Sequence, residues 1–257
     1  MELTIPERDR AKKYQGIENL QLMLRGSYEY TSHKKIYSEE NFLVYKNSKD
    51  NSMIFDSELL TRLDSGEFLK VMLSYHINKN WVPLEVTINK QVGKQNATEI
   101  YQMDLKKNTL TYQFIANNQA KVMKLQVPPK YQIATYNTVS SFLFISSKKY
   151  DPTGRNYYNI LVTNNLLEYQ GPPQMNYIVL ERISTTPQNV RVNDKNLKAI
   201  IYRIYSQSGH EKKTEEPIIS CISRHYSIPY VVEGPKNLRI QIKFLSEVEG
   251  NALSDFS

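Results

Sequence analysis

The chain has 257 residues, a single cysteine and a formal net charge of +7. One cysteine excludes an internal disulfide, and no stretch approaches the roughly 18–20 apolar residues of a membrane-spanning helix. The N-terminus also lacks the apolar stretch of a signal peptide, so a soluble cytoplasmic protein is expected.

The first segment, residues 1–19, is expected to form a short, loosely attached helix. Pro6 suits the first helical position, and Gly16 can end the helix. Because this segment offers little apolar surface, we expect the domain proper to span residues 20–257.

Alternating apolar and polar residues dominate the chain after residue 20. A strand that is buried on one face requires this period of two. The residues between the runs, such as those around Asn78, Gly93, Asn108 and Asn117, are turn formers at hairpin spacing. The predicted strands are Leu20–Tyr30, Phe42–Tyr45, Glu67–Asn78, Trp81–Asn89, Thr98–Leu105, Thr109–Ala116 and Ala120–Val127.

One segment departs from this alternation. Thr138 begins a stretch in which Val139, Phe142 and Leu143 have helical spacing, which predicts a short internal helix over 138–148. A turn is expected at 151–154. The later predicted strands are Tyr157–Thr163, Leu166–Tyr169, Asn176–Ile183, Leu197–Ser206, Ile218–Ser223, His225–Val232 and Leu238–Leu245.

These elements predict a mainly β protein built on one large, strongly curved antiparallel sheet, a half-barrel or barrel, with the short helix inside it. A flat open sheet with so many strands would be unusual. Curvature encloses an interior that either side chains or a ligand must fill.

The segment TVSSFLFISSKKYDPTG, followed by NYIVLERIS, LKAIIYRIY and ISRHYSIPY, resembles the lipoprotein-carrier half-barrel proteins and a related uncharacterised bacterial family of periplasmic β-clamps. The resemblance covers roughly residues 20–245. It implies an incomplete barrel that holds an acyl chain or another apolar ligand.

Four residues are candidates for ligand binding. Arg182 shares a predicted strand face with Ile178 and Leu180, and Arg203 shares one with Ile201 and Tyr205. A charge among apolar neighbours requires a partner, and an arginine can hold both oxygens of a carboxylate. The alternatives are an internal Arg–Glu pair, or an arginine whose stem lies on the sheet while its head reaches water. Trp81 and Tyr205 are the aromatic candidates.

Catalytic motifs are weak. Glu85, His76 and Asp104 are the candidates for an acid or base. The sequence contains neither a nucleophile-elbow motif nor a phosphate-binding glycine loop. The four histidines lack ligand spacing, so neither a metal nor a cofactor is expected. Aromatic residues interleaved with Lys or Arg occur only in fragments, such as Arg203 with Tyr205, so a nucleic-acid partner is not expected.

Three functions follow from these observations, in this order. The first is non-catalytic binding of an apolar or amphipathic small molecule, of anionic acyl type, inside the curved sheet. The second is a cofactor-free isomerase or cyclase in the mouth of the barrel. The third is an interaction subunit that docks through its basic surface.

Overall fold

The computed structural model describes residues 13–14, 18–147, 155–192, 195–206, 217–223 and 226–248. The predicted N-terminal helix lies almost entirely outside these residues. The predicted turn at 151–154 and His225 also lie outside them.

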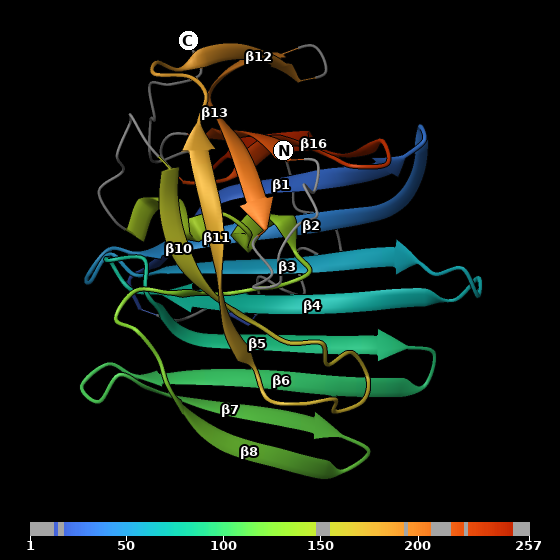
Figure 1. The fold of residues 1–257 in the computed structure, drawn as a ribbon, viewed down its shortest axis with the longest axis vertical. Coiled ribbons are helices and arrows are strands. Elements are labelled where there is room, and N and C mark those ends of the chain that lie inside the picture. The colour runs from blue at the N-terminus through green and yellow to red at the C-terminus, as the bar shows by residue number, and fades with distance from the viewer. Residues whose placement is uncertain are drawn as a thin grey trace.

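The described strands form one curved antiparallel sheet that does not close (Figure 1). Its order is β8-β7-β6-β5-β4-β3-β2-β1-β16-β15-β14-β13-β11-β10-β9, and β12 pairs only with β13. The predicted mainly β fold with one large curved sheet is therefore confirmed. The strands are β1 (Leu20–Ser32), β2 (Lys35–Asn47), β3 (Met53–Arg62), β4 (Phe68–Ile77), β5 (Pro83–Val92), β6 (Gln95–Asp104), β7 (Thr109–Ala116), β8 (Gln119–Gln126), β9 (Gln132–Ile133), β10 (Arg155–Val162), β11 (Gln174–Arg182), β12 (Gln188–Val192), β13 (Lys195–Ser206), β14 (Ile218–Ser223), β15 (Pro229–Gly234) and β16 (Leu238–Glu247).

The path of the chain has two halves. Residues 20–126 form a hairpin meander that runs outward from β1 to β8. The chain then crosses back, pairs β9 in parallel with β10, and returns strand by strand until β16 lies antiparallel to β1. As a result β10 and β11 pass in front of the long meander strands (Figure 1).

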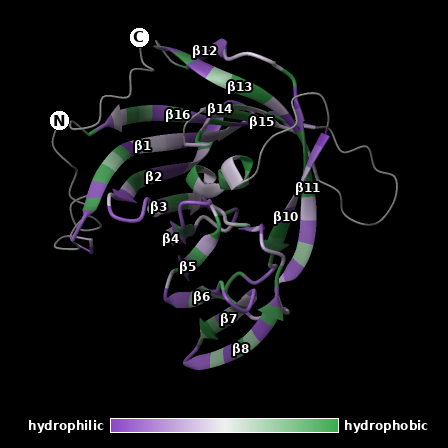
Figure 2. Cartoon of the chain, turned by 90° about the vertical axis from the view of Figure 1, so that its left-hand side faces the viewer, coloured by the Kyte–Doolittle hydropathy of each residue, from purple (hydrophilic) through white to green (hydrophobic). Residues whose placement is uncertain are grey.

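The predicted internal helix is present in a tighter form. It consists of two 3-10 segments, η1 (Thr138–Ser140) and η2 (Leu143–Ser147). These segments lie between the meander and the crossing strands β10 and β11 (Figure 2). We call the side of the sheet that they cover the inner face.

Two clusters of packed apolar side chains cover much of the described inner face. The largest apolar cluster joins Phe42, Val71 and Val86 of the meander to Ile133 and Val139 of the crossing segment. Four tyrosines of this cluster are almost completely buried, and each hydroxyl makes a hydrogen bond, as buried phenols require. The Tyr28 hydroxyl donates to Pro229 O, and the hydroxyls of Tyr101 and Tyr112 both donate to Glu99. The Tyr75 hydroxyl accepts from Ile133 N.

A second apolar cluster lies under the return half. It packs Phe142 and Phe144 against Tyr158, Leu180 and residues of β13 to β15. Three of its residues, Ile145, Ile200 and Tyr202, also line the pocket described below.

Two sequence-based expectations need correction. Leu166–Tyr169 is not a strand, because this stretch belongs to an irregular segment whose Asn165 hydrogen-bonds the backbone of residues 170 and 171. Trp81 is not in a strand: it has φ of +63° in the turn before β5, with its N–H donated to Asn78 O. Strands β3, β9 and β12 were not predicted.

Within the described residues no helix has the length and apolar character needed to cross a membrane.

Candidate functional site

A pocket of about 290 Å³ opens between the end of β11, strand β13 and η2. Its walls are Ile145, Arg182, Thr185, Thr186, Pro187, Ile200, Tyr202, Ser223 and Ser227. Its volume is close to the lower end of the range for small-molecule sites, which runs from about 300 to 1,000 Å³.

Arg182 is held in this wall by the turn that follows it. Its Nε donates to Ser184 O at 2.6 Å, and one terminal nitrogen donates to Thr185 O at 2.7 Å. The turn is itself tied to β13, because Ser184 Oγ accepts from Ile201 N at 3.0 Å. The guanidinium position is thus set by main-chain carbonyls.

The opposite wall is also fixed by hydrogen bonds. Ser227 has φ of +53° and shares a hydrogen bond of 2.6 Å with Ser146 through the two hydroxyl oxygens. Ser223 N donates to Ile228 O at 2.8 Å, which closes the turn carrying Ser227. Hydrogen bonds within the protein therefore position residues of both walls.

The chemistry of the walls is that of an anion site with an apolar side. Of the lining residues that the structure describes, Arg182 is the charged one, and five others carry a hydroxyl group. Ile145, Pro187 and Ile200 supply the apolar surface. An arginine surrounded by hydroxyl groups suits a carboxylate or phosphate, and the isoleucines suit a short alkyl chain.

Arg203 and Tyr205 do not reach this pocket. They lie on the other face of the same strands, where Arg203 Nη1 donates to Glu181 Oε2 at 3.2 Å and Tyr205 Oη donates to it at 2.9 Å. The pairing of Arg203 with a glutamate is one of the two alternatives that the sequence left open. Hydrogen bonds from Tyr205 and Arg203 lower the pKa of Glu181.

Trp81 lies far along the sheet from both groups. It is half-buried in the β4–β5 turn and packs against the main cluster. The four predicted ligand-binding residues thus occupy three places in the fold, and only Arg203 and Tyr205 come together.

The catalytic candidates occupy the meander. His76 and Glu85 lie directly opposite each other on β4 and β5. Burial lowers the pKa of His76, although the negative charges of Asp50 and Glu85 act to raise it. Glu85 is exposed, and Asp104 lies at the end of β6, where its Oδ1 accepts from Lys106 N and Lys107 N. His76 and Glu85 therefore form a pair that Asp104 does not join.

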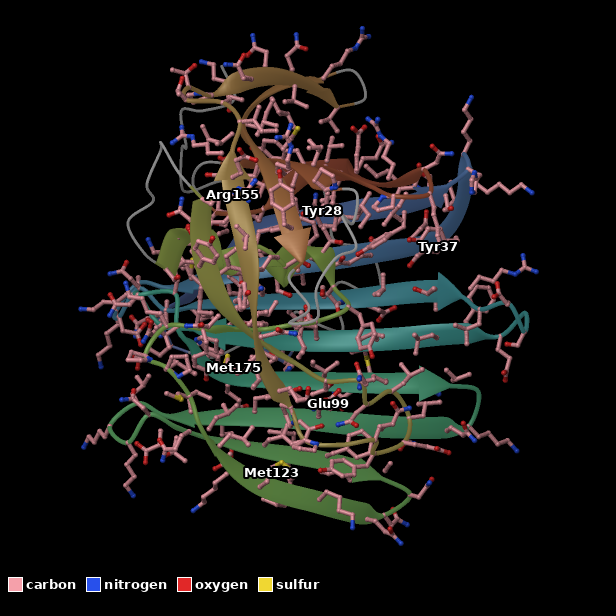
Figure 3. All side chains as sticks on the ribbon, viewed as in Figure 1. Tyr28, Tyr37, Glu99, Met123, Arg155 and Met175 are labelled. Carbon is pink, nitrogen blue, oxygen red and sulfur yellow. The ribbon has the colours of Figure 1, made fainter. Side chains whose placement is uncertain are left out.

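A buried polar cluster on the inner face was not predicted from the sequence. It centres on Glu99, which lies in front of β5 and β6 (Figure 3). The ammonium of Lys90 pairs with Glu99 and also donates to Asn165 O, while burial lowers the pKa of that ammonium. Glu99 Oε2 also accepts from Thr163 at 3.2 Å.

A second buried carboxylate holds the start of η1. Glu40 Oε2 accepts from Tyr30 Oη at 2.5 Å and from Thr138 N at 2.7 Å, and its Oε1 accepts from Val139 N at 3.3 Å. Burial raises the pKa of Glu40 to about 7, although these hydrogen bonds oppose the shift. Alternation in the sequence places Glu40 and Glu99 on apolar faces, which was the available signal for both.

Among the described residues, His, Cys, Asp and Glu side chains do not gather in groups of three that could hold a metal ion.

Two solved structures are similar to this chain. One is a beta-barrel-like protein of the domain of unknown function DUF1849 from Brucella abortus, with 6% identity and a TM-score of 0.56 over 89% of this chain and 98% of that one. The other is a DUF1089 family protein from Pseudomonas aeruginosa, with 10% identity and a TM-score of 0.49 over 76% and 88% of the two chains. No protein-family model matches the sequence, and no curated protein matches it.

The likeness to the DUF1849 protein supports the barrel-like fold and, at this identity, nothing finer. It agrees with the expected resemblance to an uncharacterised bacterial β family. The lipoprotein-carrier part of that resemblance stays a prediction.

Proposed function

We propose that this protein binds a small anionic molecule with a short apolar part in the pocket beside Arg182. The observation that carries the proposal is that the described lining residues place a guanidinium, five hydroxyl groups and three apolar side chains around this pocket. The proposal keeps the amphipathic, anionic class of ligand that the sequence indicated, and of the four predicted binding residues it uses Arg182.

Preorganisation supports the proposal. Because Arg182 is held by Ser184 O and Thr185 O, little side-chain entropy remains to be lost when an anion binds. The planar fork also favours a carboxylate or phosphate over a point-charge ligand such as chloride.

A thermal unfolding series tests this function. We expect straight-chain carboxylates from acetate to decanoate, and inorganic phosphate, to raise the Tm in a saturable way. The best of them is expected to add about 2.7 kcal/mol at a concentration of one hundred times its Kd. Calorimetry with the same probe gives the Kd directly.

Three variants sharpen the test. Arg182→Gln removes the charge and Ile200→Phe fills the hollow, so both are expected to weaken binding at least tenfold. Arg239→Gln is the control, because Arg239 pairs with Glu233 outside the pocket. A wild-type protein that none of these anions stabilises contradicts the proposal, as does equal binding by all three variants.

The alternatives of a cofactor-free isomerase or cyclase, and of an interaction subunit, stay predictions.

A further inference from the structure

The outer faces of β10, β11 and β13 bring together residues that are scattered in the sequence. The register pairs Arg155 with Glu181 and Glu181 with Arg203 in one row across the strands. The next row pairs Tyr157 with Val179 and Val179 with Tyr205, and Tyr177 follows beside Asn159. We call the two arginines and three tyrosines of these rows the Arg/Tyr platform.

Two rings of the platform, those of Tyr157 and Tyr177, are open to solvent. Tyr157 is 54% exposed and Tyr177 is 39% exposed, and their ring centroids are 6.1 Å apart with a tilt of 50°. Val179 beneath them is completely buried, so the rings form the surface while the aliphatic residue forms the support. The platform faces the viewer of Figure 3, where Arg155 is labelled.

The charges lie at one end of the platform. The Arg155 guanidinium stacks over the Tyr205 ring at 5.0 Å, and Glu181 holds both Arg203 and Tyr205. Two guanidinium groups against one carboxylate leave a net positive row beside the exposed rings, in a chain whose formal charge is +7. This combination complements an anionic polymer that also carries flat rings.

We propose that the Arg/Tyr platform binds single-stranded nucleic acid. Two bases stack on Tyr157 and Tyr177, and the arginines face the phosphates between them. Bases stack on aromatic side chains with little regard to sequence, and neighbouring arginines add phosphate contacts. The sequence alone counted against nucleic acid because Arg203 and Tyr205 were only a fragment; the strand register supplies the rest. The platform lies on the face of β11 opposite the Arg182 pocket, so this inference is independent of the proposed function.

Fluorescence anisotropy with a labelled oligo(dT) and a matching oligo(U) tests the proposal on the full chain. We expect binding at low salt that weakens as salt rises, because phosphate contacts release counterions. Comparable affinity for the two oligomers indicates contact through bases and phosphates alone. A clear preference for oligo(U) indicates that the 2′-hydroxyl is also contacted; both outcomes support the proposal.

Matched variants locate the site. We expect Tyr157→Ala combined with Tyr177→Ala to weaken binding at least about fivefold per lost stack, whereas Tyr157→Phe combined with Tyr177→Phe keeps the rings and retains binding. Phe68→Ala removes an exposed ring at the start of β4 and should leave affinity unchanged. Arg155→Gln should weaken binding and lower the salt dependence, whereas Lys121→Gln on β8 should not.

Absence of binding at low salt overturns the proposal. Undiminished binding by the double alanine variant also overturns it, because the rings would then play no part.

Discussion

Single buried carboxylates determine much of the chemistry of the inner face. Glu40 is completely buried and forms no ion pair with another described residue; it accepts hydrogen bonds from one phenol and two main-chain N–H groups. Burial raises its pKa from 4.5 to about 7, so the folded protein retains this proton more strongly than the unfolded chain does. The stabilisation is therefore complete below pH 4.5 and is lost as the pH rises through 7.

Glu40→Gln should remove this pH dependence. The shift from 4.5 to about 7, at 1.36 kcal/mol per unit, amounts to about 3 kcal/mol between pH 4 and pH 8. We expect the free energy of unfolding of the wild type, relative to the variant, to fall by that amount over this range. Urea unfolding at a series of pH values measures it.

Glu39→Gln is the matched control, because Glu39 is exposed and pairs with Lys243 at the surface. If Glu40→Gln and the wild type lose stability in parallel as the pH rises, Glu40 is not the titrating group.

Gly26 is a position where the packing excludes a side chain. A Cβ at this position would collide with the Phe42 ring and would come within 2.7 Å of Phe244 O on β16. We expect Gly26→Ala to lower the free energy of unfolding by about 1–3 kcal/mol, the usual cost of overpacking a core. Gly171→Ala should have little effect, since no atom lies within 4 Å of its Cβ position. Equal Tm values for the two variants would contradict this account.

At the scale of elements, the alternation of residues was sufficient for most strands. It located both ends of β4 and β7 to within one residue, and the turn-forming residues marked the hairpins between them. It failed for β3, where the polar residues Asp56 and Ser57 interrupt the pattern. Tyr14 and Asn137 satisfy these two side chains, and contacts across 42 and 80 residues leave no local signal.

The irregular segment after β10 shows the opposite error. Leu166 and Leu167 suggested a strand, but both pack down onto the main cluster. Asn165 determines the shape of this segment, because its side chain accepts from Gln170 N and Gly171 N and donates to Gly171 O and the Tyr112 hydroxyl. Hydrogen bonds from this side chain to the backbone of the loop replace the backbone hydrogen bonds that a strand would make to a neighbouring strand.

Asn165→Ala should therefore loosen residues 163–173 without unfolding the sheet. Removing one partner of a buried hydrogen bond costs about 1–3 kcal/mol, and here several are lost together. We expect faster hydrogen exchange and faster proteolysis confined to this segment. Asn164→Ala, at an exposed position, is the control. Unchanged exchange in the Asn165 variant would show that the apolar contacts of Leu166 and Leu167 suffice.

For the candidate sites, residue types could be predicted from the sequence, but their neighbours in space could not. Arg182 was identified as a charge on an apolar face, and it does line a pocket. The hydroxyl groups that share the pocket come from β13, the end of β14 and the turns near residues 185 and 227. The strands that lie side by side here are far apart in the sequence. Their pairing leaves no local pattern from which it could be predicted.

At the scale of the whole molecule, the return of the chain decides how the inner face is covered. The meander β1–β8 is continuous in sequence, yet its buried face is covered by η1, β9 and the segment near Asn165. The β1 edge is covered by β16, more than 200 residues later in the chain. The meander was predictable from local pattern, whereas this covering was not.

The isolated meander, residues 18–127, should consequently fail to fold cooperatively. Its hairpins remain, but the fragment would expose Phe42, Val71 and Val86 and would leave Glu40, Lys90 and Glu99 without several of their partners. We expect strand-type circular dichroism, strong binding of a hydrophobic dye and a broad thermal transition, whereas the full chain binds little dye and unfolds sharply. A sharp transition in the fragment would show that the meander folds independently and does not need the crossing segment. The expected broad transition would show instead that the return half of the chain completes the core.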